Sequence, residues 1–366
     1  MSKTAVVFSP VYYKHDTGRG HPESAERLRT IVDQLSKAKL TGNDKWQMIQ
    51  PEKAQIEDVK LVHAAEYVKL VQAICGSGGG LLDLRDTVVS PESFDTALYA
   101  VGGALKAVDL VMKKTYRNAF ALVRPPGHHA DRFRACGFCV FNNIAIAAKH
   151  LLNRYGLRRV LILDVDAHHG NGTQLTFYGT SKVLYLSLHE DPYDFPGTGF
   201  ADEIGEGEGL GYNVNIPLPY GTGDQIYLRA MSEIVEPIVC QYEPEFMLIS
   251  AGFDGYYADP VGNLSLSASC IQQVYEKMGA LASKVCQGRL VYVLEGGYNV
   301  TAVGRLVRAT IAEMSGSPCV VKKKVTTLSN NAMSQGKKAI GAVRKIQSAH
   351  WNLGDAALEK KERMKG

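Results

Sequence analysis

Short apolar runs, rich in β-branched residues, alternate along the chain with longer stretches of helical periodicity. Several of these runs are continuously apolar rather than alternating, as in residues 160–163. Continuous apolar runs are typical of strands covered on both faces, which occur in parallel sheets between helix layers. The predicted strands are residues 5–8, 119–123, 160–165, 183–188, 212–216, 246–250 and 290–294. The predicted helices are residues 24–38, 64–74, 93–113, 143–153, 224–240, 267–285, 300–314 and about 332–349.

This alternation of elements indicates an α/β fold with a central, mostly parallel, doubly wound sheet and helices on both faces. No Pro- or Ser-rich linker and no internal repeat divides the 366 residues. The length alone would allow two or three domains, but α/β folds of this size often form one unit. We therefore expect a single domain over residues 1–366, with a C-terminal helix from about residue 332.

Composition and charge narrow the class of protein. Hydrophobic residues make up 45% and charged residues 21%, which excludes a disordered or collagen-like chain. The 41 Lys+Arg and 37 Asp+Glu residues give a net charge of +4, too balanced to indicate nucleic-acid or membrane binding. No apolar run approaches the ~18 residues of a membrane span, and the first residues lack a signal-peptide pattern. We expect a cytoplasmic protein with reduced cysteines, and the sequence leaves its oligomeric state, homo-oligomers included, open.

The densest chemical signal follows the predicted strand 160–165, in the segment LDVDAHHGNG. Ligands of open α/β sheets bind beyond the carboxyl ends of strands. Asp164, Asp166 and His168 are spaced i, i+2, i+4, which places them on one side of an extended backbone. Carboxylates with an imidazole are common ligands of Zn²⁺ and related metals. A polar turn capping the next helix is the alternative, but it would not require so many ligand types together.

Three further segments at predicted strand ends carry reactive groups. RPPGHHA holds His128 and His129 behind two stiffening prolines, which suits an acid/base pair. SAGFDG adds the carboxylate of Asp254, and LEGGYN presents Tyr298, a potential donor to an oxyanion. A His pair alone could equally be surface decoration. Together, however, three metal ligands, two imidazoles and a phenol predict metal-assisted hydrolysis of a carbonyl compound.

These motifs resemble the signature segments of the zinc-dependent histone deacetylase family, which has the arginase/deacetylase fold. The matching segments are RPPGHHA, DVDAHHGNGTQ, SAGFDGYYADP and LEGGYN. The resemblance extends from HPESAERL near the start to the C-terminal helix. GHHA and HHGNGTQ are similar to the class II branch and its bacterial and archaeal relatives.

The resemblance implies a role for each matching residue of the catalytic centre. Asp166, His168 and Asp254 correspond to the ligands of the catalytic Zn²⁺, with Fe²⁺ as the alternative metal. His129 corresponds to the general base that activates water, and His128 to its electrostatic partner, supported by Asp164. Asn171 stands behind the second His, where class I members have Asp. Tyr298 corresponds to the Tyr that polarises the substrate carbonyl.

The resemblance also implies substrate and potassium sites. Gly137, Phe138 and Phe195 correspond to the walls of the acyl-lysine tunnel, Asp86 to a rim residue that holds the substrate backbone, and Val261 and Gly297 to further substrate contacts. An inner structural K⁺ site would comprise Asp164, Asp166, His168, Ser187 and Leu188. An outer K⁺ site would comprise Phe177, Thr180, Val183 and Tyr212.

The function predicted in this way is removal of acetyl or other acyl groups from lysine side chains of a protein or peptide. The alternative is an acetylpolyamine or other small acylamine amidohydrolase, which would share the metal site. Polyamine-selective relatives can carry a Glu where this chain has Val261, which argues against that gatekeeper. A non-catalytic acyl-lysine binding module is a remote alternative, since neither a metal ligand nor Tyr298 is missing. An arginase-like binuclear manganese enzyme would need more metal-binding carboxylates.

Overall fold

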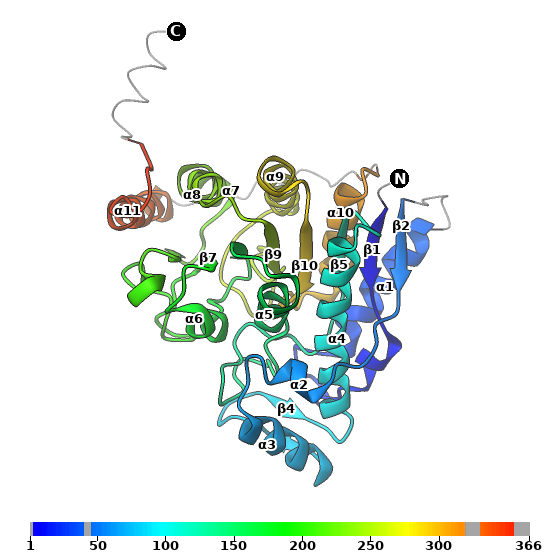
Figure 1. The fold of residues 1–366 in the computed structure, drawn as a ribbon. Helices are drawn as coiled ribbons and strands as arrows, with labels where there is room; N and C mark the ends of the chain where they lie inside the picture. Colours follow the sequence, from blue (N-terminus) through cyan, green and yellow to red (C-terminus); the bar gives the residue numbers. More distant parts are fainter. Residues whose placement is uncertain (1–2, 40–44, 318, 320–329, 355–366) are drawn as a thin grey trace.

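A parallel sheet of eight strands forms the centre of the molecule in the computed structural model, which describes residues 3–39, 45–317, 319 and 330–354. The strand order is β2-β1-β5-β10-β9-β6-β7-β8, and every neighbouring pair is parallel (Figure 1). The strands are β1 Thr4–Val7, β2 Trp46–Ile49, β5 Asn118–Ala121, β6 Val160–Asp164, β7 Val183–Glu190, β8 Asn213–Leu218, β9 Phe246–Ala251 and β10 Leu290–Leu294. The predicted α/β class is therefore confirmed.

Helices cover both faces of this sheet (Figure 1). One layer contains α1 Ala25–Lys39, α7 Asp224–Ala230, α8 Glu236–Tyr242, α9 Ala268–Cys286, α10 Val300–Met314 and α11 Asn330–Gln347. The opposite side carries α2 Ile56–Val59, α3 Ala65–Gly76, α4 Ser93–Met112, α5 Asn143–Tyr155 and α6 Asn171–Phe177. Within the described residues, no helix is long and apolar enough to cross a membrane.

Several local features differ from the sequence prediction, and the short helices α2 and α6 are among the elements that were not predicted. The predicted helix 224–240 is divided by a π-helical turn, Met231–Val235, between α7 and α8. Pro237 in the first turn of α8 accounts for this break, because proline lacks an N–H and its ring crowds the carbonyl four residues earlier, that of Glu233. The edge strand β2 and the small antiparallel pair β3 Gly80–Leu81 and β4 Val88–Val89 were not predicted, since β2 and β4 are short and only partly buried and β3 is short and exposed.

The centre of the sheet is fully buried, and its carboxyl edge collects polar residues. Every residue of β6, β9 and β10 is buried, as their continuously apolar sequences require. The five adjacent strands β5, β10, β9, β6 and β7 end at this edge. Because parallel strands bring their carboxyl ends to the same side, the segments that follow them meet there.

Candidate active site

Three buried side chains with metal-binding atoms converge beyond β6 and β9. One ligand atom each of Asp166, His168 and Asp254 lies within 4.8 Å of the other two. The Nδ1 atom of His168 is 3.3 Å from Asp166 Oδ1 and 3.1 Å from Asp254 Oδ2. Two carboxylates and one imidazole are a donor set that suits Zn²⁺ or Fe²⁺. Three protein ligands leave further coordination positions open, as in catalytic rather than structural sites.

Gly296 allows the backbone after β10 to approach these carboxylates. Its amide donates a hydrogen bond of 2.8 Å to Asp166 Oδ2. A Cβ atom at this position would lie 2.4 Å from Asp254 Oδ2 and 2.6 Å from Asp166 Oδ2. Only glycine fits so close to both oxygens, which explains why the first glycine of LEGGYN stands at this position.

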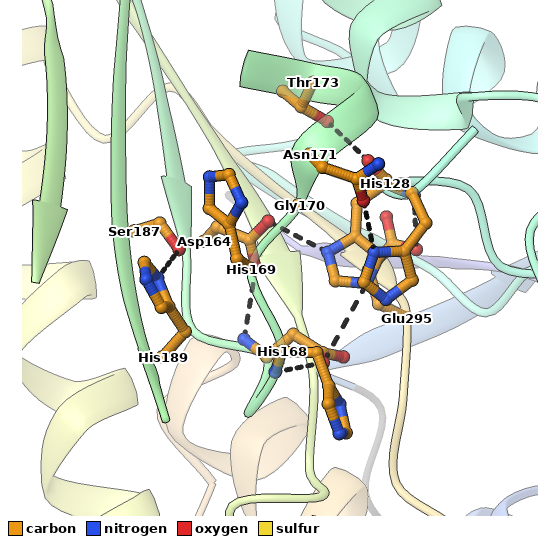
Figure 2. Close-up of polar contacts among 12 residues, drawn as sticks. His128, Asp164, His168, His169, Gly170, Asn171, Thr173, Ser187, His189 and Glu295 are labelled. Carbon is orange, nitrogen blue, oxygen red and sulfur yellow. Dashed lines mark hydrogen bonds and ion pairs between the residues drawn. The ribbon is translucent and has the colours of Figure 1, made fainter. Parts of the chain in front are cut away.

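The two neighbouring histidines have different partners behind their rings, and Figure 2 shows Asp164 beside His128. His128 Nδ1 lies 3.0 Å from Asp164 Oδ2, whereas His129 Nδ1 lies 2.8 Å from Asn171 Oδ1. Burial alone would lower the pKa of His128, but the charges of Asp164 and Asp166 outweigh burial and raise this pKa to about 10. Burial, together with the nearby charge of His128, holds the pKa of His129 well below its usual range. The pair therefore combines a protonated and a neutral imidazole.

Replacing Asn171 by Asp is expected to raise the pKa of His129, because a carboxylate favours the imidazolium form and an amide supplies no charge. A general base loses activity as the pH falls through its pKa, so the acidic limb of the kcat/KM profile should move to higher pH. The groups are coupled, so the limb is a macroscopic value and its direction is the prediction. The measurement is a pH–rate profile of metal-loaded Asn171→Asp beside the parent. An unchanged acidic limb would contradict His129 as the titrating base.

Tyr298 lines the same cavity as His129 and His168 and is held in place by several contacts. Its ring packs edge-on against Phe138, with centroids 5.6 Å apart, and the Arg27 guanidinium lies 4.8 Å from its centroid. Its amide donates to Asp259 Oδ2 at 2.7 Å. Burial raises the pKa of Tyr298 well above its usual range, so the phenol stays protonated and can donate a hydrogen bond.

A cavity of about 300 Å³ leads to these groups. Its lining includes five of the residues predicted to contact substrate: Asp86, Gly137, Phe138, Phe195 and Val261. Gly297, the sixth predicted contact, does not line the cavity; its carbonyl instead accepts a hydrogen bond of 2.8 Å from Arg27 Nε. The sequence could not reveal this difference, because the two glycines of LEGGYN are adjacent and only the geometry tells their surroundings apart.

A tight turn forms one wall of the cavity. Gly137 and Phe138 both have positive φ angles, +52° and +67°. A Cβ atom at Gly137 would lie 2.5 Å from the His129 ring and 2.9 Å from Phe195, so glycine keeps this wall close to the imidazole. Phe195 packs edge-on against His129 with centroids 5.0 Å apart. The aromatic walls thus border the reactive groups directly.

The residues predicted for potassium lie around β6 and β7. Asp164 and Ser187 are paired across these two strands, and Leu188 follows on β7. The outer set lies near the start of β7: the amide of Thr180 donates to the Phe177 carbonyl, and the Tyr212 carbonyl accepts from Tyr185. Each set of residues is therefore gathered in one region, while potassium binding itself stays a prediction.

Two buried charged residues in the site were not singled out from the sequence. Arg27 donates to the carbonyls of Gly297 and Glu295, and forms an ion pair of 3.1 Å with Glu23. Glu295 Oε2 accepts hydrogen bonds from the amides of Gly127 and His128, at 2.7 and 3.2 Å. Both residues fix the loops that carry the His pair and Tyr298. The sequence offered one indication of these roles, because Arg27 lies in the HPESAERL segment and Glu295 in the LEGGYN segment.

Comparison with known proteins shows which family carries this fold and this site. The model of the histone deacetylase domain matches residues 21–314 of the chain. A probable deacetylase from Archaeoglobus fulgidus is 42% identical over 357 residues, covering 95% of this chain and 98% of that protein. A histone deacetylase-like amidohydrolase from Pseudomonas aeruginosa is 38% identical over 303 residues, covering 83% and 79%. The crystal structure of the HDA15 HD domain superimposes with a TM-score of 0.87 at 32% identity, covering 100% of this chain and 99% of that one.

The chain therefore belongs to the histone deacetylase family, as its motifs predicted. Its relatives include archaeal and bacterial proteins, in agreement with the resemblance to the class II branch and its prokaryotic members.

Proposed function

We propose that this protein is a metal-dependent amide hydrolase that removes acetyl or other acyl groups from lysine side chains and releases the carboxylate and free lysine. The observation that carries the proposal is the convergence of three kinds of group at the end of one cavity. These are a metal-binding triad, a pair of imidazoles with opposite pKa shifts, and a protonated tyrosine. The proposed metal is Zn²⁺, with Fe²⁺ as the alternative.

The side chains divide the work of amide hydrolysis. A divalent metal held by Asp166, His168 and Asp254 would supply Lewis-acid polarisation of the amide carbonyl. His129, neutral in the resting enzyme, accepts the proton of the attacking water. Tyr298 donates a hydrogen bond to the developing oxyanion. A protonated imidazole of the pair then gives a proton to the leaving amine.

The volume and the lining of the cavity suit an acyl group on an aliphatic amine. Phe138 and Phe195 supply aromatic walls, and the volume of about 300 Å³ leaves room for an aliphatic chain. A small acylamine is the second candidate, because Asp86, Glu190 and Asp194 line this cavity and none of the lining residues among those described is Lys or Arg. Such a lining suits a substrate that carries an additional ammonium group.

A side-by-side assay tests which substrate class the enzyme prefers. The purified enzyme with a defined metal content is given acetyl-lysine peptides, longer acyl-lysine peptides and acetylpolyamines, and kcat/KM is measured for each. The proposal expects the highest value for an acyl-lysine peptide. A higher value for the acetylpolyamines would establish the second candidate instead, and hydrolysis of neither class would refute both.

Hydroxamates are expected to inhibit the enzyme. A hydroxamate offers two oxygens to a metal with open positions, and these oxygens can also bond to the His pair and Tyr298. Its linker would occupy the cavity between Phe138 and Phe195. Inhibition constants are measured for a hydroxamate and for the matching carboxamide, which lacks the chelating oxygen. Equal, weak inhibition by both compounds in a metal-loaded enzyme would contradict this arrangement.

A further inference from the structure

The imidazole of His168 meets carboxylates on both sides of its ring. Nδ1 faces Asp166 and Asp254, while Nε2 lies 3.7 Å from Oε1 of Glu190. Glu190 is the last residue of β7 and is 4% exposed. From this geometry we infer that Glu190 is a positioning residue for His168, one that orients the ring and strengthens its binding to the metal. The inference rests on the proposed function, since it takes His168 to be a metal ligand.

Asn263 holds the Glu190 carboxylate in place. The Asn263 amide N–H donates to Oε2 at 2.5 Å, and its side-chain Nδ2 donates to Oε1 at 2.9 Å. The backbone of Glu190 is fixed too, because its amide donates to the carbonyl of Ala167, the residue before His168, at 2.8 Å. Hydrogen bonds therefore hold both the backbone amide and the carboxylate of Glu190, and they fix the direction in which the carboxylate points.

A carboxylate in this place has a known physical consequence. Histidines that bind metals generally direct their second ring nitrogen at a carboxylate, a backbone carbonyl or a water. This partner fixes the tautomer with a proton on the far nitrogen and makes the ligating nitrogen a better donor. Removal of such a partner costs about 10- to 100-fold in metal affinity or activity. Among the described residues, Glu190 is the carboxylate within ion-pair distance of Nε2, and at 3.7 Å it acts on the ring through its charge rather than through a direct hydrogen bond.

Sequence position does not reveal this role. Glu190 stands two residues beyond Leu188, in the segment SLHEDP, and nothing in the local pattern separates it from the exposed Asp191 that follows. The contact with His168 arises because β6 and β7 are neighbours, so the end of β7 lies beside the segment that follows β6.

The test measures metal affinity directly in the metal-free enzyme. Zn²⁺ is titrated into wild type, Glu190→Gln and Asp194→Asn against a chromophoric chelator. Glu190→Gln keeps the size of the side chain and removes its charge, and it should raise the Kd for Zn²⁺ about 10- to 100-fold. Asp194→Asn is the matched control, because Asp194 lines the same cavity and has no ion pair with His168 among the described residues. Its Kd should stay close to that of wild type.

Two further measurements separate positioning from general stability. The Co²⁺-substituted enzyme should show a shifted d–d spectrum in Glu190→Gln, because the environment of a ligand has changed, while the thermal midpoint of the metal-free variant stays near that of wild type. If Glu190→Gln does not fold, Asn263→Ser replaces it. This variant keeps the backbone donor to Oε2 and loses the Nδ2 donor, and it should raise the Kd in the same direction by a smaller factor.

The outcomes distinguish the inference from the proposed function. A wild type that binds no Zn²⁺ would refute the proposed function itself. A wild type that binds Zn²⁺ while the folded Glu190 variant binds it equally well would overturn only the role of Glu190. An equal loss of affinity in Asp194→Asn would overturn it too, since the effect would then belong to the charge of the cavity as a whole. Where Asn263→Ser replaces Glu190→Gln, an unchanged Kd for Zn²⁺ in that variant would likewise overturn the role of Glu190.

Discussion

Asp254→Ala is expected to abolish hydrolysis, with a loss of at least about 10³-fold in kcat, because a metal-binding carboxylate at the reactive centre is removed. Lewis-acid catalysis contributes several kcal/mol, and each 1.36 kcal/mol is a factor of ten in rate. The side chain is buried beside Asp166 and His168, and its removal leaves this group with two protein ligands. Acyl release and bound metal are measured in the same preparation.

The metal-dependent part of the stability should disappear in the same variant. A ligand that binds only the folded state stabilises it by about 4 kcal/mol at 1,000 times its Kd. The wild type should therefore show a rise in Tm on addition of Zn²⁺, and Asp254→Ala should show none. Asp33→Ala, which removes an exposed carboxylate of α1 paired with Lys37, should keep both the rise and the activity. Full activity in Asp254→Ala would contradict the assigned ligand set.

Tyr298→Phe is expected to lower kcat by about 10²- to 10³-fold while metal binding and KM change little, which is the scale for loss of one oxyanion donor. The phenyl ring would still pack against Phe138 and under Arg27, so the cavity keeps its shape. The lost group is a hydroxyl that burial keeps protonated. Its contribution arises mainly when negative charge develops on the carbonyl oxygen.

Steady-state kinetics of the metal-loaded variant check this prediction. Tyr193→Phe is the matched control, since Tyr193 is 81% exposed on the loop before Phe195 and removal of its hydroxyl should leave kcat near the wild-type value. A change confined to KM in Tyr298→Phe would assign the hydroxyl to ground-state binding and contradict an oxyanion role.

The sequence predicted the central sheet because its strands are uniformly apolar and helices alternate with them. The strands β6, β9 and β10 lie close to the predicted bounds, and the reactive residues follow them directly. Short elements without strong patterns were missed, among them the edge strand β2 and the seven-residue helix α6. The break between α7 and α8 could have been anticipated from Pro237, whose effect on a helix is local.

The candidate site was predictable where one segment holds several reactive residues, as with Asp164, Asp166 and His168. Residues that support the site from distant parts of the sequence, and that the sheet brings together, were not predictable. Arg27 contacts Gly297 in the loop after β10, which is 270 residues away in the sequence, and no local pattern predicts that contact. Glu190 likewise acquires its position from the pairing of β6 with β7. Side-chain chemistry can thus be predicted from motifs, whereas the supporting contacts depend on three-dimensional packing.

Metal titration of the metal-free enzyme, with acetate release from an acetyl-lysine peptide as the readout, tests the central claim most directly. The activity should be negligible without metal, rise in proportion to added Zn²⁺ or anaerobic Fe²⁺, and level off at about one equivalent, as expected for one site with three protein ligands. Full activity in the metal-free enzyme, or a plateau that requires two equivalents, would contradict a single catalytic metal held by Asp166, His168 and Asp254.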